Sequence, residues 1–408
     1  MTIEQSIPTD FFDPRFVSNP YPIYQEWRDH HPLIWHEAMD AYVITRYEDV
    51  SRAFKEFSSE NYAWQLEPVI GRSILQMEGL EHSKQRALVT PAFRGQELKE
   101  RFVPVIQANA EALIEGFRLD SHVDLVEQFT KRFPIGVIVD MLGLPPSDHG
   151  LFHGWYSAMM AFLSNVTQDP EVTAAGLRTT EELRAYMAPI IDERRINPGD
   201  DMLSVLCTAE IDGVRMTDAE IKAFTGLLLI AGGETSDKAM ASMFKNLVNN
   251  PDQLQAVRED RSLIERAFAE TLRYSPPVRV IMRTVKVDTE LSGGLLKAGK
   301  SVACVIGAAN TDDRQYSDPN VFNIFRDDLD IPRAYSAAAN HVAFCGGRHF
   351  CVGAQLAKAE AEIGANLLLD AMEDMRFPDG YTPTEEGLFS RAPSSLLLDF
   401  RATAGALA

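Results

Sequence analysis

Two cysteines lie close together in a glycine-rich run near the C-terminal end of the sequence, where residues 344–353 read FCGGRHFCVG. The residues that follow, 354–360, have the spacing of an amphipathic helix. Backbone N–H groups of the turn and the positive end of this helix would stabilise negative charge on the second cysteine, Cys351. The pattern therefore indicates a thiolate that can bind a metal.

The same run resembles the cysteine-loop signature of the cytochrome P450 family, the haem-thiolate monooxygenases. The matching positions are Phe344, Gly347, His349, Cys351 and Gly353, whereas Cys345 stands where the family usually has glycine. The resemblance implies that Cys351 binds the iron of haem b, as a thiolate that favours O–O cleavage, and that Phe344, His349 and Gly353 lie at the cofactor. The alternatives are an inert cysteine buried at a turn and a zinc site at Cys345 and Cys351, for which no second cysteine pair of matching spacing exists.

A second cluster of residues that could take part in chemistry is the run AGGETS at residues 231–236, inside a long helical pattern. Adjacent glycines each cost roughly 1 kcal/mol relative to alanine in a helix interior, and a charge with two hydroxyls is costly to bury without partners. The run therefore predicts a distorted helix that makes room for a ligand. By the family resemblance, Glu234 and Thr235 form the acid–alcohol pair that serves dioxygen activation, and Ala231 and Gly232 leave space for dioxygen. The alternative is a kinked core helix with Glu234 in a salt bridge.

Charged residues at helical spacing suggest how the cofactor is held. Glu270 and Arg273 lie at i, i+3 on one helix face, and they resemble the family's Glu-x-x-Arg motif, with Arg326 as the third member of a structural triad. Haem carries two propionates, which cationic side chains can bind. The resemblance assigns this role to His82, Arg86, Arg283 and His349.

The elements that must position these residues are mainly helical. The longest helix is expected from Asp218 to Asn249, because a capping box precedes it at Thr217–Glu220 and Pro251 follows it. At 1.5 Å per residue it would be ~48 Å long and would cross the core. The other expected elements are helices at 21–28, through much of 97–250, and at 351–373, and strands at 33–35, 41–45, 278–283, 284–288 and 301–305.

The fold class that follows is mainly α with a small β-rich portion, which the resemblance identifies with the cytochrome P450 fold. No linker or repeat divides the sequence, so residues 1–408 are expected to form a single domain. Its β-rich parts lie at about 33–46 and 278–305, with a late turn at 387–400. Its helical core lies at about 82–275 and 351–373.

The family resemblance places the substrate on the haem face opposite Cys351. The pocket residues that it implies are Trp64, Leu227, Ile230, Ala231, Val278, Arg279, Ile281 and Phe389. Most are apolar, as in other ligand pockets, and for each of them core packing is the alternative. Arg279 is the exception: in the cavity it could bind a substrate carboxylate or carbonyl, and otherwise it pairs with a propionate or points to solvent.

Composition excludes several other classes of protein. Lys and Arg number 39 against 59 Asp and Glu, a net charge of −20 that argues against non-specific nucleic-acid binding. The first 20 residues contain no long apolar run, so neither a signal peptide nor a membrane anchor is expected there. Four cysteines in 408 residues do not suggest a disulfide framework, and a cytoplasmic protein is expected.

The predicted function is a monooxygenase that inserts one oxygen atom from dioxygen into a small, largely apolar organic substrate of secondary-metabolite, terpenoid, steroid or cyclodipeptide type. The extra run at 327–335 and the turn at 387–391 resemble the cyclodipeptide-oxidising pulcherriminic acid synthase subgroup. Electrons are expected from a separate ferredoxin, with its reductase, or from a flavodoxin, docked near Arg348, Lys358 or Arg72. The alternatives are a peroxide-driven peroxygenase and a non-catalytic haem-binding protein.

Overall fold

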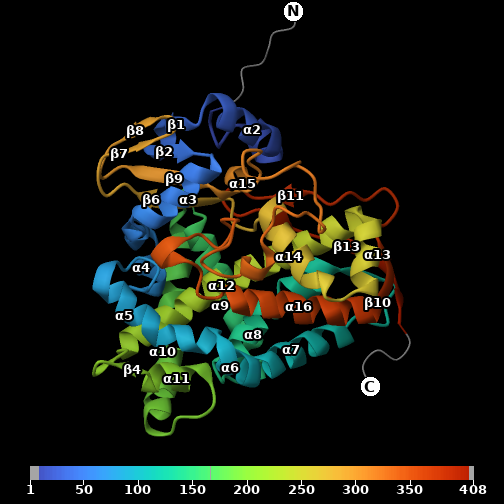
Figure 1. The fold of residues 1–408 in the computed structure, drawn as a ribbon. Coiled ribbons are helices and arrows are strands. Elements are labelled where there is room, and N and C mark those ends of the chain that lie inside the picture. The colour runs from blue at the N-terminus through green and yellow to red at the C-terminus, as the bar shows by residue number, and fades with distance from the viewer. Residues whose placement is uncertain (1–8, 166, 404–408) are drawn as a thin grey trace, which may run out of the picture. The chain divides into compact units, whose positions relative to one another are not determined.

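The computed structural model describes residues 9–165 and 167–403 (Figure 1). Their contacts divide them into two compact units, each built from separate stretches of chain. Unit 1 contains the residues up to Asn61, Lys238–Ala354 and Phe377–Leu397, and unit 2 contains Tyr62–Asp237, Gln355–Arg376 and the residues from Leu398. The single domain expected from the sequence stays a prediction.

Unit 1 contains the larger sheet and several helices. Its helices are α1 (Pro14–Ser18), α2 (Tyr21–His30), α3 (Tyr47–Glu56), α13 (Pro251–Glu259), α14 (Leu263–Tyr274) and α15 (Ile306–Ala309). Its strands are β1 (Leu33–His36), β2 (Ala41–Ile44), β6 (Val280–Thr284), β7 (Thr289–Leu291), β8 (Gly294–Leu296), β9 (Ser301–Val305), β11 (Glu385–Glu386) and β12 (Ala392–Pro393).

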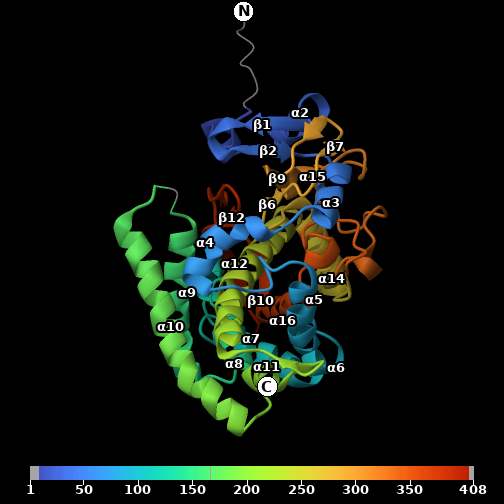
Figure 2. The ribbon, with the colours of Figure 1, turned by 90° about the vertical axis from the view of Figure 1, so that its left-hand side faces the viewer.

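Unit 2 is almost entirely helical. Its helices are α4 (Ala63–Ile70), α5 (Gly79–Val89), α6 (Gly95–Glu97), α7 (Val103–Glu115), α8 (Phe133–Met141), α9 (His149–Leu163), α10 (Pro170–Ile196) and α11 (Met202–Thr208), and most of α12 (Asp218–Asn249) and α16 (Ala354–Ala371) belongs to it. Its strands are β3 (His122–Asp124), β4 (Glu210–Ile211), β5 (Val214–Arg215), β10 (Met372–Arg376) and β13, whose bounds are Leu397–Ala402. Helices α9 and α10 pack side by side (Figure 2). The predicted mainly α class with a small β-rich portion is confirmed.

The four-stranded sheet of unit 1 has the order β1-β2-β9-β6, with β2 and β9 parallel and the other pairs antiparallel. All four strands lie where the sequence pattern predicts strands. The strand expected at 284–288 is wrong, because the chain turns after Thr284 and β7 begins only at Thr289. The physical reason is Asp288, whose carboxylate accepts the backbone N–H of Ala298 at 2.9 Å and binds Lys297 at 2.8 Å. These bonds favour a turn over a ladder.

The predicted long helix is confirmed, and α12 runs from Asp218 to Asn249. The capping box is present: Thr217 N–H donates to Glu220 at 2.7 Å, and Glu220 N–H donates back to the Thr217 hydroxyl at 3.3 Å. Helix α12 is unbroken at residues 231–236, and the predicted distortion stays a prediction. The paired glycines of α12 serve close packing: a Cβ on Gly232 would lie 2.9 Å from Ile138, and one on Gly233 2.5 Å from Ile135, both on α8.

An aromatic cluster forms much of the core of unit 1 between its N-terminal helices and the sheet. Trp27 of α2 is fully buried, stacks on Phe16 at 5.0 Å and meets Phe11 edge-on at 5.3 Å. Val43, Val280 and neighbouring apolar residues complete the cluster. Its aromatic members anchor the N-terminal helices to the sheet.

Replacing Trp27 with alanine removes this buried ring and leaves a cavity. We expect Trp27→Ala to lower the free energy of unfolding by ~3–5 kcal/mol, measured by denaturant titration of the purified protein. Trp35→Ala is the control, since Trp35 is 41% exposed. Equal losses in the two variants would contradict this description of the core.

Candidate functional site

The cysteine loop lies at the C-terminal end of an irregular stretch of unit 1. Cys351 N–H donates to the carbonyl of Phe344 at 3.0 Å, which closes the loop, and a single turn of 3-10 helix (Gly347–His349) lies within it. Helix α16 begins at Ala354, three residues after Cys351, and ends at Ala371, so the helix predicted at 351–373 is shorter at both ends. Gly353 lies beside the thiol: a Cβ built there would be 3.9 Å from Cys351 Sγ.

Gly347 shows why this loop needs glycine. Its φ is +63°, and a Cβ would lie 2.8 Å from the carbonyl oxygen of Phe54 and 3.0 Å from the Cα of Lys55. The loop backbone therefore packs directly on the end of α3, where no side chain fits. This contact fixes the loop independently of any ligand.

Phe344 connects the loop to the extra run at 327–335. Its ring, 9% exposed, lies 6.1 Å from that of Phe350 and 6.2 Å from that of Tyr335. Tyr335 in turn stacks on Phe268 of α14 at 6.0 Å and donates its hydroxyl to the Glu265 carbonyl at 2.8 Å. The extra run is thus anchored to α14 and supports the cysteine loop from one side.

Arg283 is the clearest candidate for binding an anionic group. It is 3% exposed, its Nη1 donates to the Met282 carbonyl at 2.9 Å, and its guanidinium lies over the Phe54 ring at 5.2 Å. Its Nε has no hydrogen-bond partner among the described residues, and none of the ion pairs found there involves Arg283. A buried cation without a carboxylate is costly, so its environment fits a haem propionate.

The other three predicted propionate ligands are also partly or fully buried. His349 Nε2 lies 3.1 Å from the Ser59 hydroxyl in unit 1. His82 and Arg86 occupy successive turns of α5 in unit 2, where His82 is 2% exposed and Arg86 is partly buried. All four carry N–H donors, and within unit 1 the thiol of Cys351 together with Arg283 and His349 is a set that fits haem b.

The acid–alcohol pair lies in the middle of α12, in unit 2. Ala231 is exposed and Glu234 and Thr235 are partly buried, although most residues of the preceding turns are buried. The Thr235 hydroxyl donates to the Ala231 carbonyl at 2.7 Å. Its oxygen therefore keeps its acceptor sites while its proton is held at a defined atom. Tyr156 of α9 lies against this segment, and burial, with the negative charges of Glu234 and Asp237, raises its pKa.

Sequence reasoning missed a second acid next to this pair. Glu360 of α16 is 2% exposed and accepts the hydroxyl of Ser236 at 2.5 Å. Burial raises the pKa of Glu360 to about 8, although the Ser236 hydrogen bond acts in the opposite direction. At neutral pH Glu360 is therefore mostly protonated. Ser236 and Glu360 are 124 residues apart in the sequence. The only signal for their contact was that the sequence placed a hydroxyl at expected core depth.

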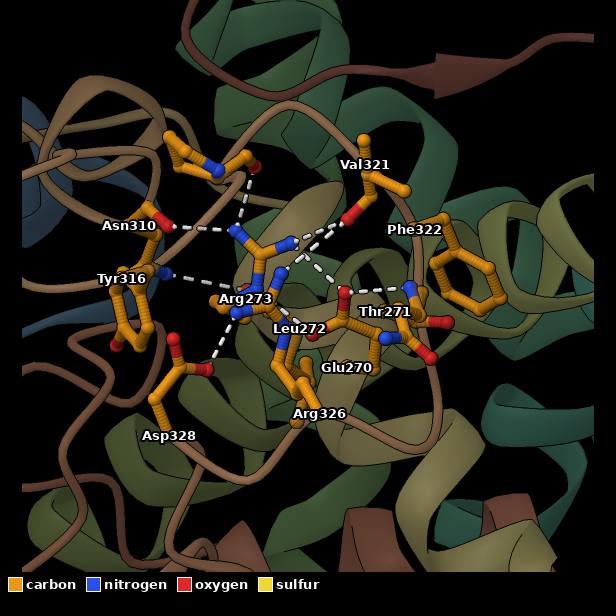
Figure 3. A network of polar contacts seen from close by, with 12 residues as sticks. Glu270, Thr271, Leu272, Arg273, Asn310, Tyr316, Val321, Phe322, Arg326 and Asp328 are labelled. Atoms are coloured by element: carbon orange, nitrogen blue, oxygen red, sulfur yellow. Dashed lines mark hydrogen bonds and ion pairs between the residues drawn. The ribbon is translucent and has the colours of Figure 1, made fainter.

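The predicted structural triad comes together in the core of unit 1 (Figure 3). Arg273 and Glu270 form a bidentate pair at 2.7 and 2.8 Å, and Arg326 Nε lies 3.0 Å from the same carboxylate. Glu270 and Arg273 are fully buried, and Arg326 is 6% exposed. Asn323, at the position where the family commonly has aspartate, donates its backbone N–H to Glu270 at 2.9 Å.

The residues predicted to line a pocket are placed in different ways. Leu227 and Ile230 are buried on α12, Val278 and Ile281 pack partly buried against the core of unit 1, and Trp64 is 76% exposed on α4. Phe389 is 36% exposed, with its ring 6.3 Å from that of Phe11. Except for exposed Trp64, these placements are compatible with core packing as well as with a pocket.

Arg279 does not lie where a substrate-binding arginine should. It is fully buried, its Nη2 lies 2.8 Å from the Tyr21 hydroxyl and 3.4 Å from Glu385, and its guanidinium lies over the Tyr21 ring at 5.2 Å. Glu385 also pairs with Lys245 and Arg391, and these cations hold its pKa at about 2 despite burial. This placement favours a structural role for Arg279, and its contact with substrate stays a prediction.

The three cations predicted at a docking surface differ in how available they are. Arg72 is engaged by Glu81 at 2.6 Å and Glu67 at 3.4 Å, and Lys358 lies 3.6 Å from Glu362. Arg348 is exposed in the cysteine loop. Arg348 is therefore the one whose charge is least compensated among these three.

Comparisons with known proteins agree with the site. The family model described as "Cytochrome P450" matches residues 164–385. Pulcherriminic acid synthase from Bacillus subtilis (strain 168) is 42% identical over 390 residues, which cover 95% of this chain and 96% of that one. Cytochrome P450 107B1 from Saccharopolyspora erythraea is 33% identical over 356 residues, which cover 83% of each chain.

Solved structures show the same fold. CYP109E1 from Bacillus megaterium in complex with corticosterone has a TM-score of 0.83 and 30% identity, covering 93% of this chain and 98% of that one. CYP109Q5 from Chondromyces apiculatus has a TM-score of 0.86 and 30% identity, with 97% and 99% covered. Within residues 9–165 and 167–403, no helix is long and apolar enough to cross a membrane.

The raised pKa of Glu360 predicts a pH dependence of stability. In the folded protein Glu360 keeps its proton up to about pH 8, whereas its ordinary pKa is 4.5. The folded state thus binds more protons than the unfolded state between these values, so this group makes the free energy of unfolding fall as pH rises. Glu360→Gln cannot titrate, and we expect it to gain on the order of 2–4 kcal/mol over the wild type between pH 5 and pH 8.

Denaturant titrations of both proteins at pH 5, 6, 7 and 8 measure this difference. Glu362→Gln, on the same helix and less buried, is the control and should give a curve parallel to the wild type. A Glu360→Gln curve that is also parallel to the wild type would show that Glu360 is ionised in the folded protein.

Proposed function

Since the chain belongs to the cytochrome P450 family, we propose that it inserts one oxygen atom from dioxygen into a small, largely apolar organic substrate, with Cys351 as the thiolate ligand of haem b. Members of this family are monooxygenases that bind haem b and use dioxygen. The observation that carries the proposal is the closed cysteine loop: Cys351 N–H is bonded to Phe344 at 3.0 Å, and the next helix begins three residues later.

The residues around the loop have distinct tasks. Cys351 would hold the iron, and Arg283, His349, His82 and Arg86 are the residues that the family resemblance assigns to the propionates. Haem with a thiolate ligand supplies cleavage of the O–O bond. Arg283 is the strongest of these assignments, because its buried charge has no carboxylate among the described residues.

Residues of α12 and of its neighbour α16 supply protons to the site. Thr235 holds its proton on the Ala231 carbonyl at 2.7 Å, so its oxygen can accept a bond while a proton is passed on. Glu234, the adjacent partly buried acid, connects Thr235 to solvent. Glu360, with its pKa raised to about 8, and Ser236 form a second proton-holding pair directly after Thr235.

The substrate class that we favour is a cyclodipeptide. The support is the 42% identity to pulcherriminic acid synthase over nearly the whole of both chains, together with the extra run at 327–335. Steroids are the second candidate, because CYP109E1, at 30% identity, has been solved with corticosterone and with testosterone. Apolar side chains such as Leu227, Ile230 and Val278 suit either class.

Electrons are supplied by a separate ferredoxin, with its reductase, or by a flavodoxin. Exposed Arg348 in the cysteine loop attracts an acidic carrier to the side of the protein where Cys351 lies. We expect the enzyme to work in the cytoplasm, where such carriers are kept reduced.

The test is a reconstituted reaction with a ferredoxin system, in which product, consumed dioxygen and released peroxide are measured. A panel of cyclodipeptides and testosterone serves as substrate. We expect oxygenated product from a cyclodipeptide, with one atom of labelled dioxygen incorporated. In Thr235→Ala, product per dioxygen should fall by tenfold or more, on the order of a general acid–base contribution, while peroxide release rises.

Thr225→Ala is the matched control. Thr225 lies on the same helix, and its hydroxyl makes the same type of bond, to the Ile221 carbonyl at 3.0 Å. It should leave the ratio of product to dioxygen unchanged. Product formed with peroxide but never with the ferredoxin system would favour a peroxygenase, and reduction of dioxygen without any product across the panel would favour a non-catalytic haem protein.

A further inference from the structure

Cys345 has a backbone conformation that its residue type disfavours. Its φ is +59°, in the left-handed region. The other non-glycine residues with positive φ in the described chain are Asp40, Gln168, Asp212, Asp318 and Asp374. Four of these five are aspartates, which tolerate this region because a short polar side chain can bond locally. Cys345 has no such compensation, and the strain is of the order of 1–3 kcal/mol.

Cys345 is partly buried in unit 1, against charged and apolar neighbours. It packs on the cluster that contains Phe54, Cys304 and Val342. The Arg283 guanidinium lies close enough to act on the pKa of the Cys345 thiol, and both side chains pack against Phe54. Burial raises the pKa of the Cys345 thiol, so at neutral pH the sulfur is a neutral, weak acceptor.

Arg283 is a buried cation whose neighbours are uncharged. Besides Cys345, its surroundings are the Phe54 ring at 5.2 Å, the Met282 carbonyl at 2.9 Å and the buried thiol of Cys304. None of these is an anion, and Arg283 Nε has no hydrogen-bond partner among the described residues. Cys345 and Cys351 belong to one closed loop, so the contact ties Arg283 to the loop that carries the thiolate.

We propose that Cys345 is a positioning residue for the haem: its thiol holds the Arg283 guanidinium in place, so that Arg283 meets a propionate without losing side-chain freedom on binding. The proposal rests on the function proposed above, in which Arg283 binds a propionate. Preorganisation of this kind strengthens binding by reducing its entropic cost. It also explains why a strained cysteine stands where glycine would be free of strain.

The test measures how fast haem leaves the purified holoenzyme to an excess of an apo-globin that scavenges haem. Cys345→Ala keeps the strained backbone but removes the thiol, and we expect haem release to be about three- to tenfold faster. Cys345→Ser keeps a hydrogen-bond acceptor and should release haem at nearly the wild-type rate. Cys345→Gly relieves the strain, so it should be as stable as the wild type or more stable, yet release haem as fast as Cys345→Ala.

A double-mutant cycle with Arg283→Ala separates positioning from packing. If Cys345 acts through Arg283, the variant with both substitutions releases haem no faster than Arg283→Ala alone. Cys207→Ala is the control for loss of a buried thiol, since Cys207 lies in unit 2 against the Ile191 carbonyl, and it should not change the rate.

The outcomes distinguish this inference from the function on which it rests. If Arg283→Ala itself releases haem at the wild-type rate, the propionate role of Arg283 is wrong. If Arg283→Ala is faster but Cys345→Ala is not, or if the two effects multiply in the double variant, then the positioning role of Cys345 is wrong.

Discussion

One buried carboxylate organises the part of unit 1 that carries the cysteine loop. Glu270 binds both Arg273 and Arg326. Both arginines also donate to backbone carbonyls, and Arg326 in addition binds the Asp328 carboxylate. Arg273 reaches the carbonyls of Asn310, Pro319 and Val321 at 2.8–3.1 Å. Residues 310–346 contain turns but almost no regular structure, so their backbone groups need other partners. The triad supplies several of them.

The cysteine loop depends on this arrangement through Asn310. Its side-chain oxygen accepts the N–H of Val342 at 2.9 Å, and its own backbone carbonyl is held by Arg273. A loop fixed in this way can present Cys351 in one geometry before any cofactor arrives. Loss of one partner from a buried ion cluster leaves an uncompensated charge, which explains why the triad matters to a site that it does not touch.

The acids of this protein lie in different electrostatic surroundings. Glu234 is partly buried on α12, whereas Glu360 is almost fully buried and holds its proton to about pH 8. Glu385, nearly as buried, has a pKa of about 2 because three cations surround it. Burial alone therefore does not decide whether a buried acid is protonated. The number of nearby cations decides it.

Local signals made much of this molecule predictable, and long-range contacts account for the rest. The capping box at Thr217 and the proline at 251 define α12, and the apolar run at 301–305 is a strand because it pairs on both sides. Strands β3, β10 and β13, which form one sheet from distant segments, have no comparable local pattern. Likewise, nothing in the sequence shows that Arg279 points to Glu385 or that Glu360 meets Ser236, since those directions are set only when distant elements pack.

The absorption spectrum of the reduced, carbon-monoxide-bound protein tests the central claim, thiolate ligation of haem by Cys351, most directly. A strongly red-shifted Soret band in the wild type, absent from Cys351→Ser but retained in Cys345→Ser, is the predicted result. A wild-type band at the position typical of histidine-ligated haem, or a wild type that binds no haem, would contradict it.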